Sequence, residues 1–152
     1  MMDKDSLLKL DNQLCFAIYA CSKEIVGLYR PFLDDLGITY TQYITLLALW
    51  EKDDIALKEL GEKLFLDSGT LTPLLKKMEV AGLLYRQRSK DDERILRIRL
   101  TDKGRALKKN AHEVAQQVFC ASQLSIAETV GMRDQLRDLL TRLTEAKSKS
   151  LV

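Results

Sequence analysis

Proline, glycine, histidine and paired cysteines are all scarce in this chain of 152 residues. Two prolines and seven glycines are too few for a linker-rich or fibrous protein. His112 is the one histidine and there is no CxxC pair, so the chain lacks the ligand spacing of an ordinary zinc site, and we expect no metal and no cofactor. A Ser-His-Asp hydrolase would need His112 as its base, and no nucleophile-elbow motif lies near it. We therefore expect a protein that is not an enzyme.

Long apolar runs are lacking too. No stretch approaches the ~20 consecutive apolar residues of a membrane-spanning helix. Residues 1–5 carry no basic region followed by an apolar run, so they do not resemble a secretory signal. The three cysteines, Cys15, Cys21 and Cys120, are odd in number and widely spaced, which argues against a structural disulfide framework. We expect a cytoplasmic protein with no membrane partner.

The residues that are present give the composition of a globular protein, with 46% apolar and 30% charged residues. At ~100–200 residues per domain, the length predicts a single domain over residues 1–152. The formal net charge of +2 excludes a bulk polycation but allows a local basic patch.

Helical periodicity is clearest near the N-terminus. Six apolar residues alternate steps of four and three, which predicts a long helix over residues 6–35 that needs a partner helix. They are Leu14, Ile18, Cys21, Ile25, Leu28 and Phe32. Pro31 and Gly37 place the end of this helix in the low thirties. A second helix follows a cap at Thr39 or Thr41. Its expected inward side chains are Tyr43, Ile44, Leu47 and Trp50.

A helix-turn-helix is predicted over residues 57–82. Its first helix covers about residues 57–64, with leucines on one face, and its second helix ends at a glycine. Asp67 or Ser68 can cap the second helix, and Pro73 then removes a backbone bond beyond the first turn. Alternatively Thr72 is the cap, and Pro73 takes the first helical position.

The period then changes from helical to alternating. Leucine or isoleucine alternates with arginine over residues 96–100, which predicts a strand with one apolar face. Residues 83–88 can pair with it, and the polar residues 89–94 suit a hairpin tip. Residues 83–101 therefore form a predicted wing.

Two more helices are predicted over residues 102–147, the first capped by Thr101 and the second opened by the capping box Ser125-Ile126-Ala127-Glu128. The order of elements predicts a mainly α fold with a small β-hairpin. A winged helix-turn-helix over residues 39–101 lies between long dimerisation helices at 6–35 and 102–147. The small central unit cannot cover the apolar stripes of these helices, so we expect a homodimer.

The second helix of the helix-turn-helix carries polar side chains away from its apolar face. Hydroxyls and a proline ring on an exposed first turn can meet base edges and thymine methyls, and lysines further along suit phosphates. The candidates for DNA binding are Ser68, Thr70, Thr72, Pro73, Lys76 and Lys77. A solvated helix face is the other interpretation of this pattern.

Basic charge is concentrated in the wing. From Arg86 to Arg105 the chain has eight basic and four acidic residues, a net +4, which leaves −2 for the rest of the chain. Arg94 at the hairpin tip can enter a minor groove, and Asp92 can orient it by a bidentate pair. Lys90 and Arg86 add positive charge. Together, the helix pair, the hydroxyls and the basic hairpin predict binding to double-stranded DNA.

Cys15 lies on a second stripe of the first helix, with Tyr19 and Tyr29. Cys15 and Tyr29 are ~21 Å apart along one helix, so they meet only if a partner chain packs antiparallel, as in a C2 dimer. A phenol that donates a hydrogen bond to sulfur favours thiolate, the form that attacks a peroxide. A buried, inert cysteine with aromatic neighbours is an equal alternative here. Cys21, on the apolar stripe, is expected to be a small core residue.

Four segments carry a resemblance to a known family, and two motifs within them, Asn12-Gln13-Leu14-Cys15-Phe16 and Asp67-Ser68-Gly69-Thr70-Leu71-Thr72-Pro73, are far more specific than a generic winged helix. The four segments are Leu10-Asp11-Asn12-Gln13-Leu14-Cys15-Phe16-Ala17-Ile18-Tyr19, Ile38-Thr39-Tyr40-Thr41-Gln42-Tyr43, Leu66-Asp67-Ser68-Gly69-Thr70-Leu71-Thr72-Pro73-Leu74-Leu75-Lys76 and Asp91-Asp92-Glu93-Arg94. Together they resemble the organic-hydroperoxide repressors, the OhrR branch of the MarR family, over roughly residues 7–145.

This resemblance implies roles for individual residues. Cys15 matches the cysteine that senses peroxide, and Tyr29 and Tyr40 match tyrosines that hydrogen-bond its sulfur from the other subunit. Tyr19 matches a further tyrosine of the pocket.

The resemblance also implies a second redox cysteine. Residues 118–122 resemble the segment that bears the resolving cysteine of two-cysteine members, so Cys120 is expected to form a disulfide with Cys15 of the other subunit. Cys21 matches no functional position, which agrees with its expected place in the core.

The function implied is that of a dimeric repressor which binds an inverted-repeat operator. An organic hydroperoxide oxidises Cys15, the disulfide with Cys120 forms, and the operator is released. One alternative is a ligand-responsive MarR-type regulator without redox chemistry, in which Cys15 is simply buried. Another is a thiol peroxidase that does not bind DNA, but the basic hairpin and the lack of a CxxC recycling motif argue against it.

Overall fold

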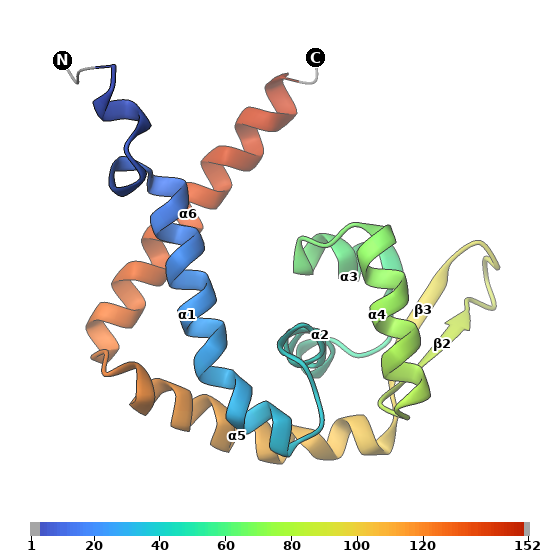
Figure 1. Ribbon diagram of the computed structural model, residues 1–152. Helices are drawn as coiled ribbons and strands as arrows, with labels where there is room; N and C mark the ends of the chain where they lie inside the picture. The colour runs from blue at the N-terminus through green and yellow to red at the C-terminus, as the bar shows by residue number, and fades with distance from the viewer. Residues whose placement is uncertain (1–3, 151–152) are drawn as a thin grey trace. The chain divides into compact units, whose positions relative to one another are not determined.

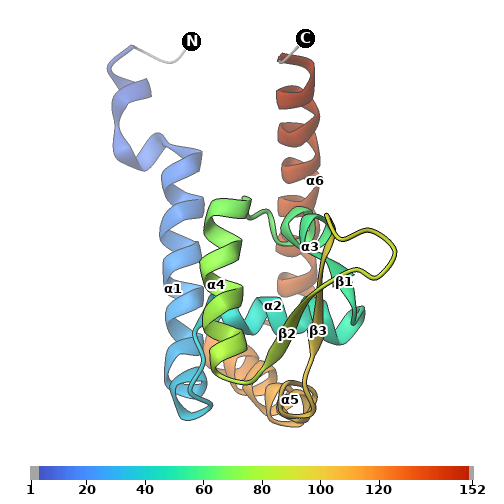
Figure 2. The ribbon, with the colours of Figure 1, turned by 90° about the vertical axis from the view of Figure 1, so that its right-hand side faces the viewer.

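The computed structural model describes residues 4–150 in two compact units, the first ending at Val118 and the second beginning at Phe119. The elements are η1 (Ser6–Leu8), η2 (Leu10–Asn12), α1 (Leu14–Asp35), α2 (Tyr40–Glu51), β1 (Ile55–Ala56), α3 (Leu57–Leu64), α4 (Ser68–Val80), β2 (Leu84–Arg88), β3 (Leu96–Leu100), α5 (Asp102–Ser122) and α6 (Ile126–Ser150). Figure 1 labels the α-helices, β2 and β3, and Figure 2 also labels β1. Helices dominate, and the strands form one antiparallel sheet, which confirms the predicted fold class. The assignment of a single domain to residues 1–152 stays a prediction. Among residues 4–150, no helix has the length and hydropathy that a membrane crossing needs.

The first α-helix begins later than the sequence predicts. The 3-10 turns η1 and η2 occupy the segment before α1. Lys9, between the two turns, and Gln13, between η2 and α1, are extended. The Asn12 amide donates to the carbonyl and hydroxyl oxygens of Ser6 at 2.8 and 3.1 Å. Such local side-chain bonds compete with helix formation, so the predicted start at residue 6 is wrong. The helix also continues through Pro31 and ends just before Gly37, which has a φ of 67°.

Thr39 caps α2 in a capping box. Its hydroxyl accepts from the backbone N–H of Gln42, whose side-chain oxygen accepts from the Thr39 N–H at 2.9 Å. The buried face differs from the predicted one, because α2 is apolar on several sides. Leu46 and Leu49 are fully buried, whereas Leu47, expected inside, is 38% exposed.

The helix-turn-helix consists of α3 and α4, and α3 has the predicted bounds. Figure 2 shows α4 beside the β2–β3 hairpin, which it contacts. Asp67 caps α4 by accepting from the backbone N–H of Thr70 at 2.9 Å. The alternative cap at Thr72 is therefore wrong, and Pro73 lies inside the helix.

The hairpin of β2 and β3 is in the predicted place, with Leu84 opposite Leu100. No sequence pattern predicts β1, which pairs with the other edge of β3 so that Ile55 faces Ile98. Two residues are too few to show an alternating period. The resulting strand order is β1-β3-β2.

The core of the first unit lies where α2, α3, α4 and the sheet meet. Its fully buried large side chains are Leu33, Leu46, Leu49, Ile55, Leu60, Leu71, Leu75, Met78, Leu84 and Ile98. Helix α5 adds Ala111, Val114 and Val118 from its predicted inner stripe.

In the second unit, α6 opens with the predicted capping box. The Ser125 N–H donates to the Glu128 carboxylate at 2.9 Å, and the Glu128 N–H donates back to the Ser125 hydroxyl at 3.2 Å. None of the α6 side chains that the structure describes is buried. Met132, Leu136 and Leu143, expected to point inward, are 45%, 50% and 53% exposed. The apolar stripe of α6 is therefore largely exposed in the single chain.

Candidate redox and DNA-binding sites

The DNA-binding candidates of α4 lie on the solvent side of the helix. Five of the six are exposed and Thr72 is half-buried, while Leu71, Leu75 and Met78 on the opposite face fill the core. The Thr70 hydroxyl donates to Asp67 at 3.2 Å. Hydrogen bonds from the Thr70 backbone and side chain lower the pKa of Asp67. Two hydrogen bonds between Thr70 and Asp67 thus hold the first turn of α4.

The tip of the wing holds the predicted pair of Asp92 and Arg94. The Arg94 guanidinium donates two parallel hydrogen bonds to the Asp92 carboxylate, both 3.0 Å long, and the Arg94 backbone N–H donates a third. These bonds lower the pKa of Asp92 and raise that of Arg94. The Arg94 side chain is nevertheless 91% exposed, so its pair with Asp92 holds an exposed guanidinium in one orientation at the tip. Lys90 at the same tip is exposed as well.

Arg86, another DNA-binding candidate, has a partner inside the protein. Its backbone N–H and its guanidinium both donate to the Glu79 carboxylate, at 3.0 and 2.9 Å. Burial acts to raise the pKa of Glu79, but these bonds and the charge of Arg86 lower it overall. Because Glu79 belongs to α4 and Arg86 to β2, this pair joins the helix to the wing.

Three tyrosines gather where α1 meets α2. The rings of Tyr29 and Tyr40 are 5.1 Å apart, and Tyr43 lies 5.5 Å from Tyr29 and 6.3 Å from Tyr40. Burial raises the pKa of all three phenols, so each stays protonated at neutral pH and can donate a hydrogen bond. The sequence singled out Tyr29 and Tyr40 but placed Tyr43 only in the core.

Cys15 does not belong to this cluster within one chain. It is the second residue of α1, 14 residues before Tyr29, a distance of ~21 Å along the helix axis. Tyr19 also lies away from the cluster and is 58% exposed, with the Lys23 ammonium 5.4 Å from its ring centre. Only a second chain can bring a Cys15 to Tyr29 and Tyr40.

All three cysteines are free thiols and exposed in the single chain. Cys21 belongs to the apolar stripe of α1 that needs a partner helix, so its expected place in a core stays a prediction. Cys120 lies two residues before the end of α5. It therefore sits where a helix frays most easily.

An open, mostly apolar groove of about 200 Å³ runs between α2 and α5. Tyr43, Leu47 and Trp50 line it from α2, and Ala111 and His112 line it from α5. Tyr43 belongs to both the tyrosine cluster and the groove, so the two lie side by side.

Known proteins resemble the chain over nearly its whole length. The family described as transcriptional regulator SarA/Rot matches residues 27–111. The organic hydroperoxide resistance transcriptional regulator of Bacillus subtilis is 46% identical over 143 residues, which covers 94% of this chain and 97% of the relative. The chain belongs to the MarR/SarA family of winged-helix transcriptional regulators, in the branch of the organic-hydroperoxide regulators.

Solved structures of AbfR, a protein of Staphylococcus epidermidis, agree with this membership. Reduced AbfR bound to DNA has a TM-score of 0.75 and 37% identity, covering 93% of this chain and 99% of AbfR. Disulfide-formed AbfR has a TM-score of 0.64 and 36% identity, covering 93% and 96%. The family membership confirms the resemblance and the expectation of a regulator rather than an enzyme. The two-cysteine type stays a prediction.

Proposed function

We propose that the protein is a dimeric, DNA-binding repressor that senses organic hydroperoxides in the cytoplasm. The observation that carries this proposal is the contact between Tyr29 and Tyr40, two phenols from different helices whose rings lie 5.1 Å apart. The name of the Bacillus subtilis relative supports the class of oxidant. The DNA-bound reduced form and the disulfide form of AbfR support a redox switch of DNA binding.

The sensing step takes place between subunits. Cys15 of one subunit approaches Tyr29 and Tyr40 of the other, and the two neutral phenols donate hydrogen bonds that stabilise its thiolate. Tyr19, one helical turn after Cys15, completes the wall of the pocket. The thiolate attacks the terminal oxygen of the hydroperoxide and the O–O bond breaks. Sulfur is oxidised to sulfenic acid, and the peroxide, after taking up a proton, is reduced to an alcohol.

The resolving step uses Cys120. The thiolate of the partner subunit's Cys120 attacks the sulfenic sulfur, an S–S bond forms, the S–O bond breaks, and the hydroxide that leaves takes up a proton to become water. The two Cα atoms must come within ~7 Å for this bond. A position two residues before the end of α5 lets the last turn unwind to close that distance. This movement is the proposed switch.

DNA binding uses the exposed face of α4 and the wing. One α4 per half-site enters the major groove of an inverted-repeat operator, with the two half-sites about one helical turn apart. The residues proposed to contact bases or phosphates are Ser68, Thr70, Thr72, Pro73, Lys76, Lys77, Lys90 and Arg94. Asp92 orients the guanidinium of Arg94. Arg86, held by Glu79, adds positive charge behind them and keeps the wing against α4.

The test starts from operator DNA selected from a random pool by the reduced protein. Fluorescence anisotropy follows binding before and after one equivalent of cumene hydroperoxide, and again after dithiothreitol. We expect release, then recovery, and a covalent dimer on a non-reducing gel. Cys120→Ser should still form sulfenic acid at Cys15 but release DNA less completely. Binding that ignores the hydroperoxide would favour a regulator without redox chemistry, and peptide mapping that finds mainly Cys15–Cys21 or Cys21–Cys120 links would overturn the disulfide.

A further inference from the structure

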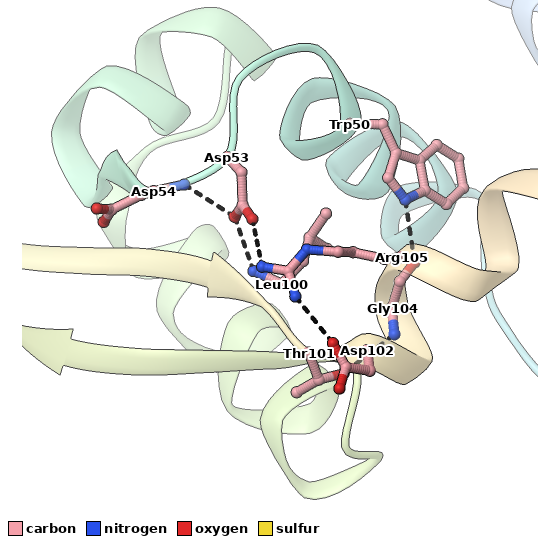
Figure 3. Close-up of polar contacts among 8 residues, drawn as sticks. All are labelled: Trp50, Asp53, Asp54, Leu100, Thr101, Asp102, Gly104 and Arg105. Atoms are coloured by element: carbon pink, nitrogen blue, oxygen red, sulfur yellow. Dashed lines mark hydrogen bonds and ion pairs between the residues drawn. The ribbon is translucent and has the colours of Figure 1, made fainter.

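The carboxylate of Asp53 connects the first turn of α5 to the winged helix (Figure 3). Asp53 has no part in the proposed DNA contacts or in the proposed redox chemistry. Asp53 lies in the loop between α2 and β1. One of its oxygens accepts from the Leu100 backbone N–H at 2.8 Å, and the other accepts from the Arg105 guanidinium at 2.8 Å. Leu100 ends β3 and Arg105 lies in the first turn of α5, so Asp53 holds the strand and the helix together. We call Asp53, Leu100 and Arg105 the Asp53 joint.

Further contacts hold the same turn of α5 from other sides. The Trp50 indole N–H donates to the Gly104 carbonyl at 3.0 Å (Figure 3). A Cβ added at Gly104 would lie 2.1 Å from the Leu83 carbonyl oxygen, so glycine is required where α5 passes the start of β2. The hydroxyl of Thr101 accepts from the Gly104 N–H at 3.0 Å and donates to the Gly82 carbonyl at 2.6 Å. The beginning of α5 is therefore fixed to α2, to the turn that precedes β2, and to the end of β3.

The charge of Asp53 belongs to this arrangement. Burial acts to raise its pKa, but the bonds from Leu100, Arg105 and Asp54 lower it overall, so the group is a carboxylate at neutral pH. Arg105 also pairs with Asp102 at 3.2 Å, within α5 itself. The Asp53–Arg105 pair thus joins α5 to the loop between α2 and β1, whereas the Asp102–Arg105 pair lies within α5.

We propose that Asp53 is a positioning residue for DNA binding: it fixes the direction of α5 relative to the wing, and so sets the spacing between the two reading heads of a dimer. This inference rests on the proposed function. In such a dimer α5 connects each wing to the apolar surfaces that bind the partner chain. Here a reading head is the α4 helix and the wing of one subunit. If the joint is stiff, a tilt of α5 displaces the reading head of the same subunit. If the joint is loose, each reading head can change its orientation on the DNA separately.

The distinguishing property is tolerance of half-site spacing. A variant with a merely weaker fold loses affinity for every operator by the same factor. A variant with a loose joint still places each α4 in its own half-site, and it binds operators of altered spacing relatively better. The ratio of the affinity for the correctly spaced operator to the affinity for an operator of altered spacing therefore measures the stiffness of the Asp53 joint, whatever the absolute affinity is.

The experiment uses the full-length reduced protein with its selected operator, and with operators that have one base pair added or removed between the half-sites. Asp53→Asn is nearly isosteric and keeps an oxygen for the Leu100 N–H, but it loses the charge opposite Arg105. Arg105→Gln removes the same ion pair from its more exposed side, and Arg105→Lys retains the charge. Glu59→Gln is the matched control, because it breaks the nearby pair of Lys52 and Glu59, which does not involve α5.

We expect Asp53→Asn and Arg105→Gln to lower the spacing ratio by about two- to fivefold, the range of a single partly exposed ion pair. Arg105→Lys should recover part of the ratio, and Glu59→Gln should leave it unchanged. An unchanged ratio in both Asp53→Asn and Arg105→Gln, with similar losses for all operators, overturns the inference while the proposed function stands. Failure of the wild-type protein to select any DNA overturns the proposed function itself.

Discussion

The winged-helix centre and the terminal helices contain the same kinds of apolar residue but bury them differently. In the centre, Leu60, Leu75 and Ile98 are completely buried. On the terminal helices, Leu14 is 65% exposed and Leu136 is 50% exposed. The centre therefore completes its core from its own chain, whereas the apolar stripes of the ends still need a cover.

The two regions also divide the proposed chemistry. The centre carries the side chains proposed to read DNA, and its contacts join elements that are far apart in the sequence, such as Asp53 and the Leu100 N–H. The ends carry Cys15 and Cys120, which are free, exposed thiols in the single chain. A sensor built in this way can change its ends without unfolding its DNA-reading centre.

The largest expected effect separates sensing from DNA reading. Cys15→Ser should bind the operator like the reduced wild type, because serine is similar in size and lies outside the centre. It should not respond to cumene hydroperoxide at all, since its hydroxyl is not a peroxide-reactive thiolate. Operator anisotropy with and without the peroxide measures this. Cys21→Ser is the control and should respond normally; release of the Cys15→Ser protein by the peroxide would show that another residue is the sensor.

Truncating one leucine in each region compares their sources of stability. Leu75→Ala in α4 should cost about 2–5 kcal/mol of unfolding free energy, the range for a fully buried leucine, at any protein concentration. Leu136→Ala in α6 should matter mainly through the dimer, so its effect should grow as the protein is diluted. Thermal and urea unfolding at several concentrations test both variants. An effect of Leu136→Ala that does not depend on concentration would argue against a partner chain on α6.

Tyr29→Phe tests whether the tyrosine cluster of one chain activates the thiol of another. The ring contacts with Tyr40 and Tyr43 should remain, and only the hydroxyl is lost. A hydrogen bond to a charged group contributes about 1.5–3 kcal/mol, so oxidation of Cys15 should slow by about tenfold or more. Stopped-flow oxidation rates at neutral pH measure it, with Tyr85→Phe, an exposed tyrosine of the wing, as the control. Unchanged rates in both Tyr29→Phe and Tyr40→Phe would remove the proposed activation.

Arg94→Ala tests the centre on its DNA-reading side. If Arg94 enters a minor groove, operator binding should weaken by about 1–3 kcal/mol, with a loss of preference at the contacted positions. Lys76→Ala should instead weaken binding to all sequences alike and reduce its salt dependence. Titrations at two salt concentrations distinguish them. Parental affinity in Arg94→Ala would exclude the wing from the interface.

Local sequence patterns predicted the centre better than they predicted contacts across it. The bounds of α3 and β3 were correct, because each follows from a clear period of apolar residues. Leu46 rather than Leu47 faces the core, since α2 is apolar on more than one side and the period alone cannot choose. The pairing of Arg86 with Glu79 and the place of Tyr43 in the tyrosine cluster depend on packing between elements, which no local pattern contains.

The N-terminal end differs from its prediction at its start. The helix expected from residue 6 starts at Leu14, because the Asn12 side chain bonds back to Ser6 and favours separate turns. The stripe that carries Cys21 needs a partner helix, so the place of Cys21 in a core stays a prediction. Periodicity shows that a face is apolar; it does not show which molecule covers that face.

The smallest expected effect concerns the ion pair that attaches α5 to the centre. Asp53→Asn should reduce the unfolding free energy at pH 7 by no more than about 1 kcal/mol, because partly exposed ion pairs contribute about 0.2–1 kcal/mol. The pKa of Asp53 is lowered in the folded protein from its ordinary 3.8. Its contribution is therefore fully present above about pH 4 and is lost as the pH falls through the folded value. Urea unfolding of the two proteins across this range should give curves that are separate near neutral pH and converge in acid. A gap that persists to about pH 2 would mean that the amide fits the joint poorly, so that shape and not charge holds α5 to the wing.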